Sequence, residues 1–129
     1  TFVMDGAHDP AGAGALKEAI EEQYPDKPRV LVFTSLQDKD TETVIQLLIR
    51  KGDRVFLTEA PTPRTRKPEE IAAMIDEQKI AAVHTAEPSV TKALDAAQKE
   101  AKDGDVVIIC GSLYILGEAM EWMAKKIGN

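Results

Sequence analysis

The stretch DVVIIC at residues 105–110 contains five consecutive apolar residues, and RVLVFT at residues 29–34 contains four. Alternating polar and apolar residues would leave one face of a strand exposed. An unbroken apolar run is instead typical of a strand buried on both faces of a parallel sheet. Three further runs with a strand-like composition lie at Thr1–Met4, Arg54–Thr58 and Ala81–Thr85. We therefore expect five strands, with the two longest apolar runs in the interior.

Apolar residues with helical spacing separate these runs. Leu16, Ile20 and Tyr24 recur at four-residue intervals. Comparable stripes occur in the four later segments: Val44 and Leu48; Ile71, Met74 and Ile75; Val90, Leu94 and Ala97; Leu116, Met120, Met123 and Ile127. Strands that alternate with helices predict an α/β fold, a Rossmann-like, doubly wound and mostly parallel sheet flanked by helices.

Glycine and proline residues mark the expected ends of these helices. We expect the second helix to end at Lys51-Gly52 and the fourth at Lys102-Asp103-Gly104, because glycine is favoured just after a helix. Pro68 and Pro88 lie where the third and fourth helices are expected to begin.

Length and composition predict one domain over residues 1–129. The net charge of −6 argues against nucleic acid as a partner, since nucleic-acid binders usually carry a basic face. The single cysteine, Cys110, excludes an internal disulfide and fits a cytoplasmic protein. No apolar run is long enough to cross a membrane, so no membrane partner is expected. Because the chain starts at Thr1 in a strand-like run, we expect it to be part of a longer protein.

Ligands of doubly wound sheets bind at the carboxyl ends of the strands. The first of these ends is followed by DGAHDP, residues 5–10. Asp5 either accepts the hydroxyl groups of a ribose or is a turn or N-cap residue that bonds nearby backbone. His8 either binds an anion or transfers a proton, or it caps the following helix. We expect no special role for His84.

Three further candidates follow other strands. Ser112 comes directly after Gly111 and stands where a helix begins, so its hydroxyl either binds a carboxylate or phosphate, or caps the helix. Lys39 either meets a phosphate or is solvated. Arg64 has the planar fork suited to a phosphate or carboxylate, or is a plain surface residue.

Two nucleotide-binding patterns are absent from the sequence. It has no GxxxxGK[ST] loop and no GxGxxG after the first strand, because the glycines of Ala11–Gly14 lie inside the first expected helix. A dinucleotide-binding domain is therefore disfavoured despite the topology. With two histidines and one cysteine, a transition-metal site formed by this chain alone is not expected.

Four motifs together resemble a known family. They are DGAHDP at residues 5–10, LQDKD at 36–40, PR at 63–64 and GSLYILGEA at 111–119. In order and spacing they are similar to the C-terminal domain of folylpolyglutamate synthase, including the bifunctional dihydrofolate synthase forms, within the Mur ligase superfamily. GSLYILGEA is the most specific of the four, and DGAH is shared more widely among Mur ligases.

The resemblance implies an ATP-dependent ligase that joins L-glutamate to a folate or to dihydropteroate through an acyl phosphate. The charge that develops in such a reaction must be met by cations and fixed donors. In the family, the N-terminal ATPase domain supplies the phosphate-binding loop, the Mg²⁺ ligands and the folate pocket. That domain is therefore an expected partner, and residues 1–129 alone are expected not to turn over.

Matching motifs also imply residue roles. Asp5 corresponds to the acid that binds the ATP ribose, His8 to a catalytic residue beside the acyl phosphate and glutamate, and Ser112 to a contact with the glutamate carboxylate. Lys39 and Arg64 are carried over as contacts of the ATP site. The family commonly has Asn where this chain has Asp9, and an ionised Asp accepts hydrogen bonds but cannot donate them, so Asp9 is left out of the site.

Two other functions remain open on the sequence. The chain could be the C-terminal domain of another Mur ligase, one that acts on a peptidoglycan precursor, although such a domain should lack GSLYILGEA. It could also be a non-catalytic nucleotide-binding module of the same fold.

Overall fold

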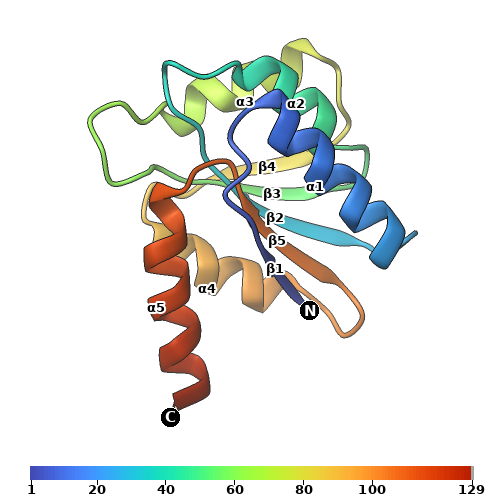
Figure 1. Cartoon of the computed structure of the whole chain (residues 1–129), viewed down its shortest axis with the longest axis vertical. Helices are drawn as coiled ribbons and strands as arrows, with labels where there is room; N and C mark the ends of the chain where they lie inside the picture. Colours follow the sequence, from blue (N-terminus) through green and yellow to red (C-terminus); the bar gives the residue numbers. More distant parts are fainter. Residues whose placement is uncertain (129) are drawn as a thin grey trace.

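The computed structural model describes residues 1–128, and the side chains of residues 1–126. Strands and helices alternate along the chain (Figure 1): β1 (Phe2–Met4), α1 (Pro10–Gln23), β2 (Arg29–Phe33), α2 (Thr41–Leu48), β3 (Arg54–Leu57), α3 (Pro68–Glu77), β4 (Val83–Ala86), α4 (Val90–Glu100), β5 (Val106–Cys110) and α5 (Tyr114–Gly128). Each expected strand and helix is present.

The five strands form one sheet in the order β1-β5-β2-β3-β4, and every pair of neighbours is parallel. The two longest apolar runs, β2 and β5, lie side by side in the middle, in a register that pairs Leu31 with Ile108. Every residue of both strands is buried. The prediction from DVVIIC and RVLVFT is confirmed.

Helices cover both faces of the sheet (Figure 1). On one face, α1, α2 and α3 pack on Leu31 and Phe33 of β2. On the other face, α4 and α5 pack on Val30 and Val32 of the same strand. Because successive side chains of a strand point to opposite faces, β2 contributes to both layers of the core. The doubly wound α/β fold is therefore confirmed.

Two predicted helix ends are wrong. The second helix stops at Leu48, not at Gly52, because Ile49 is extended and buried in the core. The fourth stops at Glu100, not at Gly104. Both glycines instead have a positive φ, +89° and +91°, in the turns that lead into β3 and β5, a conformation that glycine adopts without strain.

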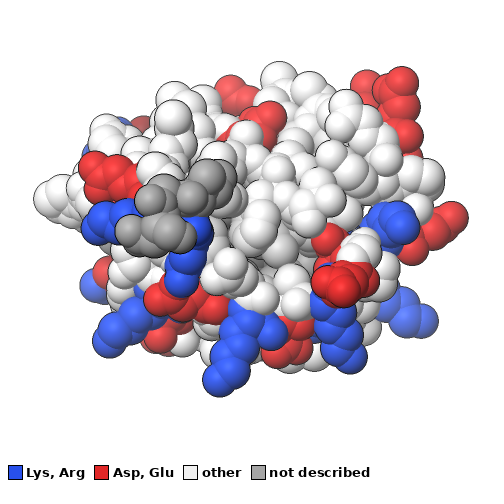
Figure 2. All heavy atoms as spheres, turned by 90° about the horizontal axis from the view of Figure 1, so that it is seen from below, with Lys and Arg blue, Asp and Glu red and all other residues white. Residues whose placement is uncertain are grey.

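Pro68 is the first residue of α3, as predicted, whereas Pro88 comes before Ser89, the N-cap of α4. Within residues 1–128, no helix is both long and apolar enough to cross a membrane. Seen from below, acidic and basic side chains are interspersed around an uncharged area (Figure 2).

Candidate functional site

A pocket of about 120 Å³ lies at the carboxyl edge of the sheet. Its lining comes from four loops or loop–helix junctions: His8, Leu36, Lys39, Arg64, Ser112, Leu113 and Tyr114. A pocket of this volume has room for a small anionic group such as a carboxylate or phosphate. Four of the five predicted site residues line it, and Asp5 does not.

The loop from β1 to α1 holds Asp5 beside the pocket. The backbone N–H of Asp5 donates to Ile109 at 3.0 Å, which extends the pairing of β1 with β5. The Oδ1 atom of Asp5 accepts from the N–H of Ala7 at 2.8 Å, so the carboxylate forms the turn that was one of its two predicted roles. The side chain is exposed, and its other oxygen remains available to a ligand.

His8 lines the pocket, and a hydrogen bond to the backbone indicates which ring nitrogen carries the proton. Its Nδ1 lies 2.8 Å from the carbonyl oxygen of Gly6, and because a carbonyl only accepts, Nδ1 carries a proton. In the neutral ring, Nε2 is then an acceptor, and it lies 3.8 Å from the Asp9 carboxylate. This arrangement suits a group that takes up a proton and then holds it beside a carboxylate.

Asp9 is the N-cap of α1. Its Oδ1 accepts from the N–H of Gly12 at 2.8 Å, and Pro10 starts the helix. This role needs only an acceptor, so the carboxylate serves it as well as an amide would.

The loop from β5 to α5 depends on Gly111. Its φ is +104°, and a Cβ atom there would lie 1.9 Å from the carbonyl oxygen of Thr34. This close approach brings Ser112 next to the end of β2. Ser112 is 1% exposed, and its Oγ accepts from the N–H of Tyr114 at 3.0 Å. The predicted cap is thus formed, and the hydroxyl proton is still able to bind a ligand oxygen.

Lys39 and Arg64 add positive charge from the loops after β2 and β3. The Arg64 guanidinium donates to Asp38 at 3.2 Å and to the hydroxyl of Tyr114 at 3.1 Å. Its side chain stays 53% exposed, so the ion pair with Asp38 is solvated and weak enough for a ligand anion to replace. With the N-terminus of α5, these cations favour an anion in the pocket.

The sequence analysis missed Tyr114. The residue lies inside the quoted GSLYILGEA motif, two positions after Ser112, and this was the one signal that pointed to it. Its contact with Arg64 joins residues 50 positions apart, which no local pattern reveals.

Cys110 is not a nucleophile here, although it directly precedes the Gly111 loop. The thiol is fully buried in the core, and this burial raises its pKa to about 12. A thiol of that kind is inert near neutral pH. Among the residues described, no group of three or more His, Cys, Asp or Glu side chains is placed to hold a metal ion.

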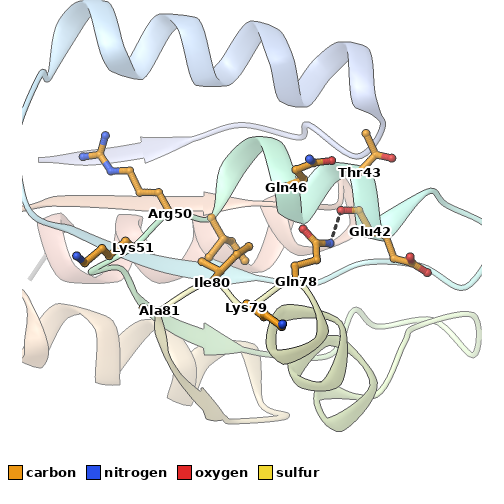
Figure 3. A pocket seen from close by; sticks show the side chains of 10 residues that line it. Glu42, Thr43, Gln46, Arg50, Lys51, Gln78, Lys79, Ile80 and Ala81 are labelled. Carbon is orange, nitrogen blue, oxygen red and sulfur yellow. Dashed lines mark hydrogen bonds between the residues drawn. The ribbon is translucent and has the colours of Figure 1, made fainter.

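A larger hollow of about 710 Å³ lies between α2 and the end of α3 (Figure 3). There the Nε2 of Gln78 donates to the carbonyl oxygen of Glu42 at 2.7 Å, and Arg50, Lys51 and Lys79 point outward. None of the predicted site residues lines it. The larger hollow and the predicted site residues therefore lie in different parts of the molecule.

Two known proteins that are similar in sequence to this chain have names that refer to the synthesis of folates. It is 28% identical over 141 residues to the dihydrofolate synthetase of Saccharomyces cerevisiae, covering 99% of this chain and 32% of that protein. It is 32% identical over 128 residues to a probable bifunctional folylpolyglutamate synthase/dihydropteroate synthase of Haloferax volcanii, covering 98% of this chain and 15% of that protein. The chain thus spans about a third or less of the length of these relatives.

The fold is also shared with solved structures. The Mycobacterium tuberculosis folylpolyglutamate synthase, complexed with ADP and AMPPCP, superposes with a TM-score of 0.82 at 26% identity, over 94% of this chain and 29% of that one. Residues 1–113 match the family described as Mur ligase, glutamate ligase domain. The chain therefore belongs to the Mur ligase family, as one of its glutamate ligase domains.

Proposed function

We propose that residues 1–129 form the C-terminal domain of an ATP-dependent ligase that adds L-glutamate to a folate, to dihydropteroate, or to both. The observation that carries this proposal is the gathering of His8, Lys39, Arg64 and Ser112 around one anion-sized pocket. Relatives named dihydrofolate synthetase and folylpolyglutamate synthase support the substrate class.

In this proposal the pocket binds a carboxylate of the incoming glutamate. The Ser112 hydroxyl and the N-terminus of α5 donate to it, and Lys39 and Arg64 supply the countercharge. The sequence resemblance implied instead that both cations contact ATP; we propose the glutamate carboxylate as their ligand because they share the pocket with Ser112. A small pocket with fixed donors holds the amino acid in one orientation, which lowers the entropic part of the barrier.

His8 would act on the attacking amine. Glutamate enters as an ammonium ion, and its nitrogen must lose a proton before its lone pair can attack the acyl phosphate. The unprotonated Nε2 of His8 takes that proton, and the free amine attacks the acyl carbon to form the new C–N bond. The C–O bond to phosphate then breaks, and the second proton of the nitrogen leaves with the inorganic phosphate. The Asp9 carboxylate lies 3.8 Å from Nε2, beside the imidazolium formed in the first step.

Asp5 would bind the ribose of ATP with the carboxylate oxygen that does not form the turn. ADP and AMPPCP in the Mycobacterium tuberculosis structure support a nucleotide in the complete enzyme. The residues described hold no acidic cluster for Mg²⁺, so we assign the Mg²⁺ ligands and the phosphate-binding loop to the part of the ligase outside this chain. Residues 1–129 alone would therefore not turn over.

Steady-state kinetics of the full-length ligase test these roles. Ser112→Ala and Lys39→Met should each raise the KM for glutamate about tenfold, since each removes a hydrogen bond to a charged group. Asp5→Ala should raise the KM for ATP and leave that for glutamate unchanged. An unchanged KM for glutamate in Ser112→Ala or in Lys39→Met would overturn the proposed role of the pocket, and an unchanged KM for ATP in Asp5→Ala would overturn the role of Asp5. Dihydropteroate, tetrahydrofolate and a peptidoglycan precursor, each offered as the acceptor, distinguish a folate ligase from another Mur ligase.

A further inference from the structure

The loops after β2 and β3 are held together by backbone pairing. Leu36 and Thr65 form an antiparallel bridge between them. The N–H of Gln37 donates to the carbonyl of Arg64 at 2.9 Å, and the N–H of Arg66 donates to the carbonyl of Ser35 at 2.9 Å. The two loops are therefore joined through their backbones. Lys39 extends from one of them and Arg64 from the other, and both side chains line the pocket.

The side chain of Arg66 binds these two loops from outside the pocket. It does not line the pocket, and it is 17% exposed. Its Nη2 lies 3.1 Å from the carbonyl oxygen of Gln37 and 3.3 Å from that of Lys39, and its Nε donates to the Thr41 hydroxyl at 2.9 Å. One guanidinium thus binds the loop on both sides of Asp38 and also the first residue of α2.

Thr41, which accepts the hydrogen bond from Arg66, is itself buried. The Thr41 hydroxyl lies 2.6 Å from that of Ser35, and both residues are 1% exposed. Arg66 is also oriented by Glu70, at 3.6 Å, one turn into α3. The contacts run from Ser35, just after β2, through Thr41 and Arg66 to the carbonyl of Lys39. The Lys39 backbone also donates to the carbonyl of Leu36 at 3.1 Å and accepts from the N–H of Thr41 at 2.9 Å, so Arg66 adds a side-chain restraint to these local ones.

We propose that Arg66 is a positioning residue for the glutamate-binding pocket: it fixes the backbone from which Lys39 and Arg64 extend. This inference rests on the proposed function of that pocket. A lysine whose backbone is unrestrained must be ordered when the ligand binds, and that ordering weakens binding. The planar fork of arginine reaches several acceptors at once, which a single ammonium group cannot do.

The test uses the full-length ligase with Arg66→Met and Arg66→Lys. Arg50→Met is the matched control, because Arg50 also donates to a backbone carbonyl, that of Lys27 at 3.2 Å, but lines the hollow in Figure 3. Arg66→Met should raise the KM for glutamate about tenfold and leave the KM for ATP within about twofold, because ligand positioning is lost rather than the fold. Arg66→Lys should raise the KM for glutamate by a smaller factor, and the control Arg50→Met should leave it unchanged.

A double variant tests whether Arg66 acts through Lys39. If it does, Arg66→Met should raise the KM for glutamate by a smaller factor in a Lys39→Met background than in the wild-type enzyme. Equal factors in both backgrounds would overturn the inference. Should Arg66→Met fail to fold, Arg66→Lys decides instead, and an unchanged KM for glutamate in that variant is the negative result.

The outcomes separate this inference from the proposed function. If Lys39→Met leaves the KM for glutamate unchanged, the proposed function of the pocket is wrong and the inference falls with it. If Lys39→Met raises that KM but Arg66→Met does not, only the inference is wrong. A lower melting temperature and kcat for Arg66→Met, with an unchanged KM, would show a purely structural role and also overturn it.

Discussion

Charged side chains at the amino and carboxyl edges of the sheet differ in their burial and in their partners. At the amino edge, the turns before β3 and β5 share one design, in which the N–H of Arg50 or Lys102 donates at 2.9 Å to an aspartate three residues later. Each of these aspartates is buried and binds an arginine from another strand. Asp53 binds Arg29 of the adjacent β2, and Asp105 binds Arg54 of β3, which is separated from β5 by β2. These two carboxylates are therefore paired within the protein, whereas other charged residues of the same turns, such as Lys51 and Asp103, are exposed.

At the carboxyl edge the cations are left accessible. Arg64 pairs with Asp38, and both side chains are about half exposed, at 53% and 51%. The loops there are held by backbone pairing rather than by buried ion pairs, as Leu36 and Thr65 show. The amino edge thus buries two aspartates in ion pairs that stabilise the fold, whereas the carboxyl edge leaves the Arg64–Asp38 pair exposed and accessible to a ligand.

The largest effect is expected at the amino edge. Asp53→Ala removes the partner of the Arg29 guanidinium, which is 5% exposed, so it should lower the free energy of unfolding by about 3–5 kcal/mol. Urea unfolding followed by circular dichroism measures the loss. A loss of about 1 kcal/mol or less, as for a surface pair, would contradict the buried-pair account.

Gly111→Ala should have the next largest effect. Gly104→Ala is its control, because both glycines have a similar positive φ but only Gly111 has a neighbour that a Cβ atom would strike, the Thr34 carbonyl. The backbone strain in Gly104→Ala should cost about 1 kcal/mol, and the overlap in Gly111→Ala about 1–3 kcal/mol more. Equal losses in the free energy of unfolding for Gly111→Ala and Gly104→Ala, measured in the same urea experiment, would show that the Gly111 loop shifts to accommodate the Cβ atom.

Asp105 should make stability depend on acidity. Hydrogen bonds from the Lys102 N–H and from Arg54 hold the pKa of this carboxyl below its ordinary value. The unfolded state then binds the proton more tightly, so the stabilisation is full above about pH 4 and is lost as the pH falls through the folded-state pKa. Urea unfolding between about pH 2 and 6 should show a shallower acid decline for Asp105→Asn. Parallel curves would contradict this.

The smallest effect is expected at the carboxyl edge. Asp38→Ala breaks an exposed ion pair and should lower the free energy of unfolding by about 0–1 kcal/mol. The same change frees Arg64, so it should leave glutamate binding by the full-length ligase unchanged or tighter. A stability loss as large as that of Asp53→Ala would remove the contrast between the two edges.

Several features could be predicted because their cause is local. Five apolar runs separated by amphipathic segments predict the alternating strands and helices, and the parallel order places residues such as His8 and Ser112 at one edge. Helix ends were predicted less well. Gly52 and Gly104 look like helix caps in the sequence, but burial of Ile49 and the aspartate turns end the helices earlier.

The sequence by itself determined the α/β class and four residues that line one pocket at the carboxyl edge of the sheet. Only the tertiary structure decided that Asp5 forms a turn, that Tyr114 binds Arg64, and that Arg66 braces the Lys39 loop. The physical reason is the separation along the chain over which each interaction acts. Apolar periodicity and turn chemistry depend on residues a few positions apart. The contacts of Arg66 with Lys39 and of Arg64 with Tyr114 join residues 27 and 50 positions apart, and they form only when the sheet brings the loops together.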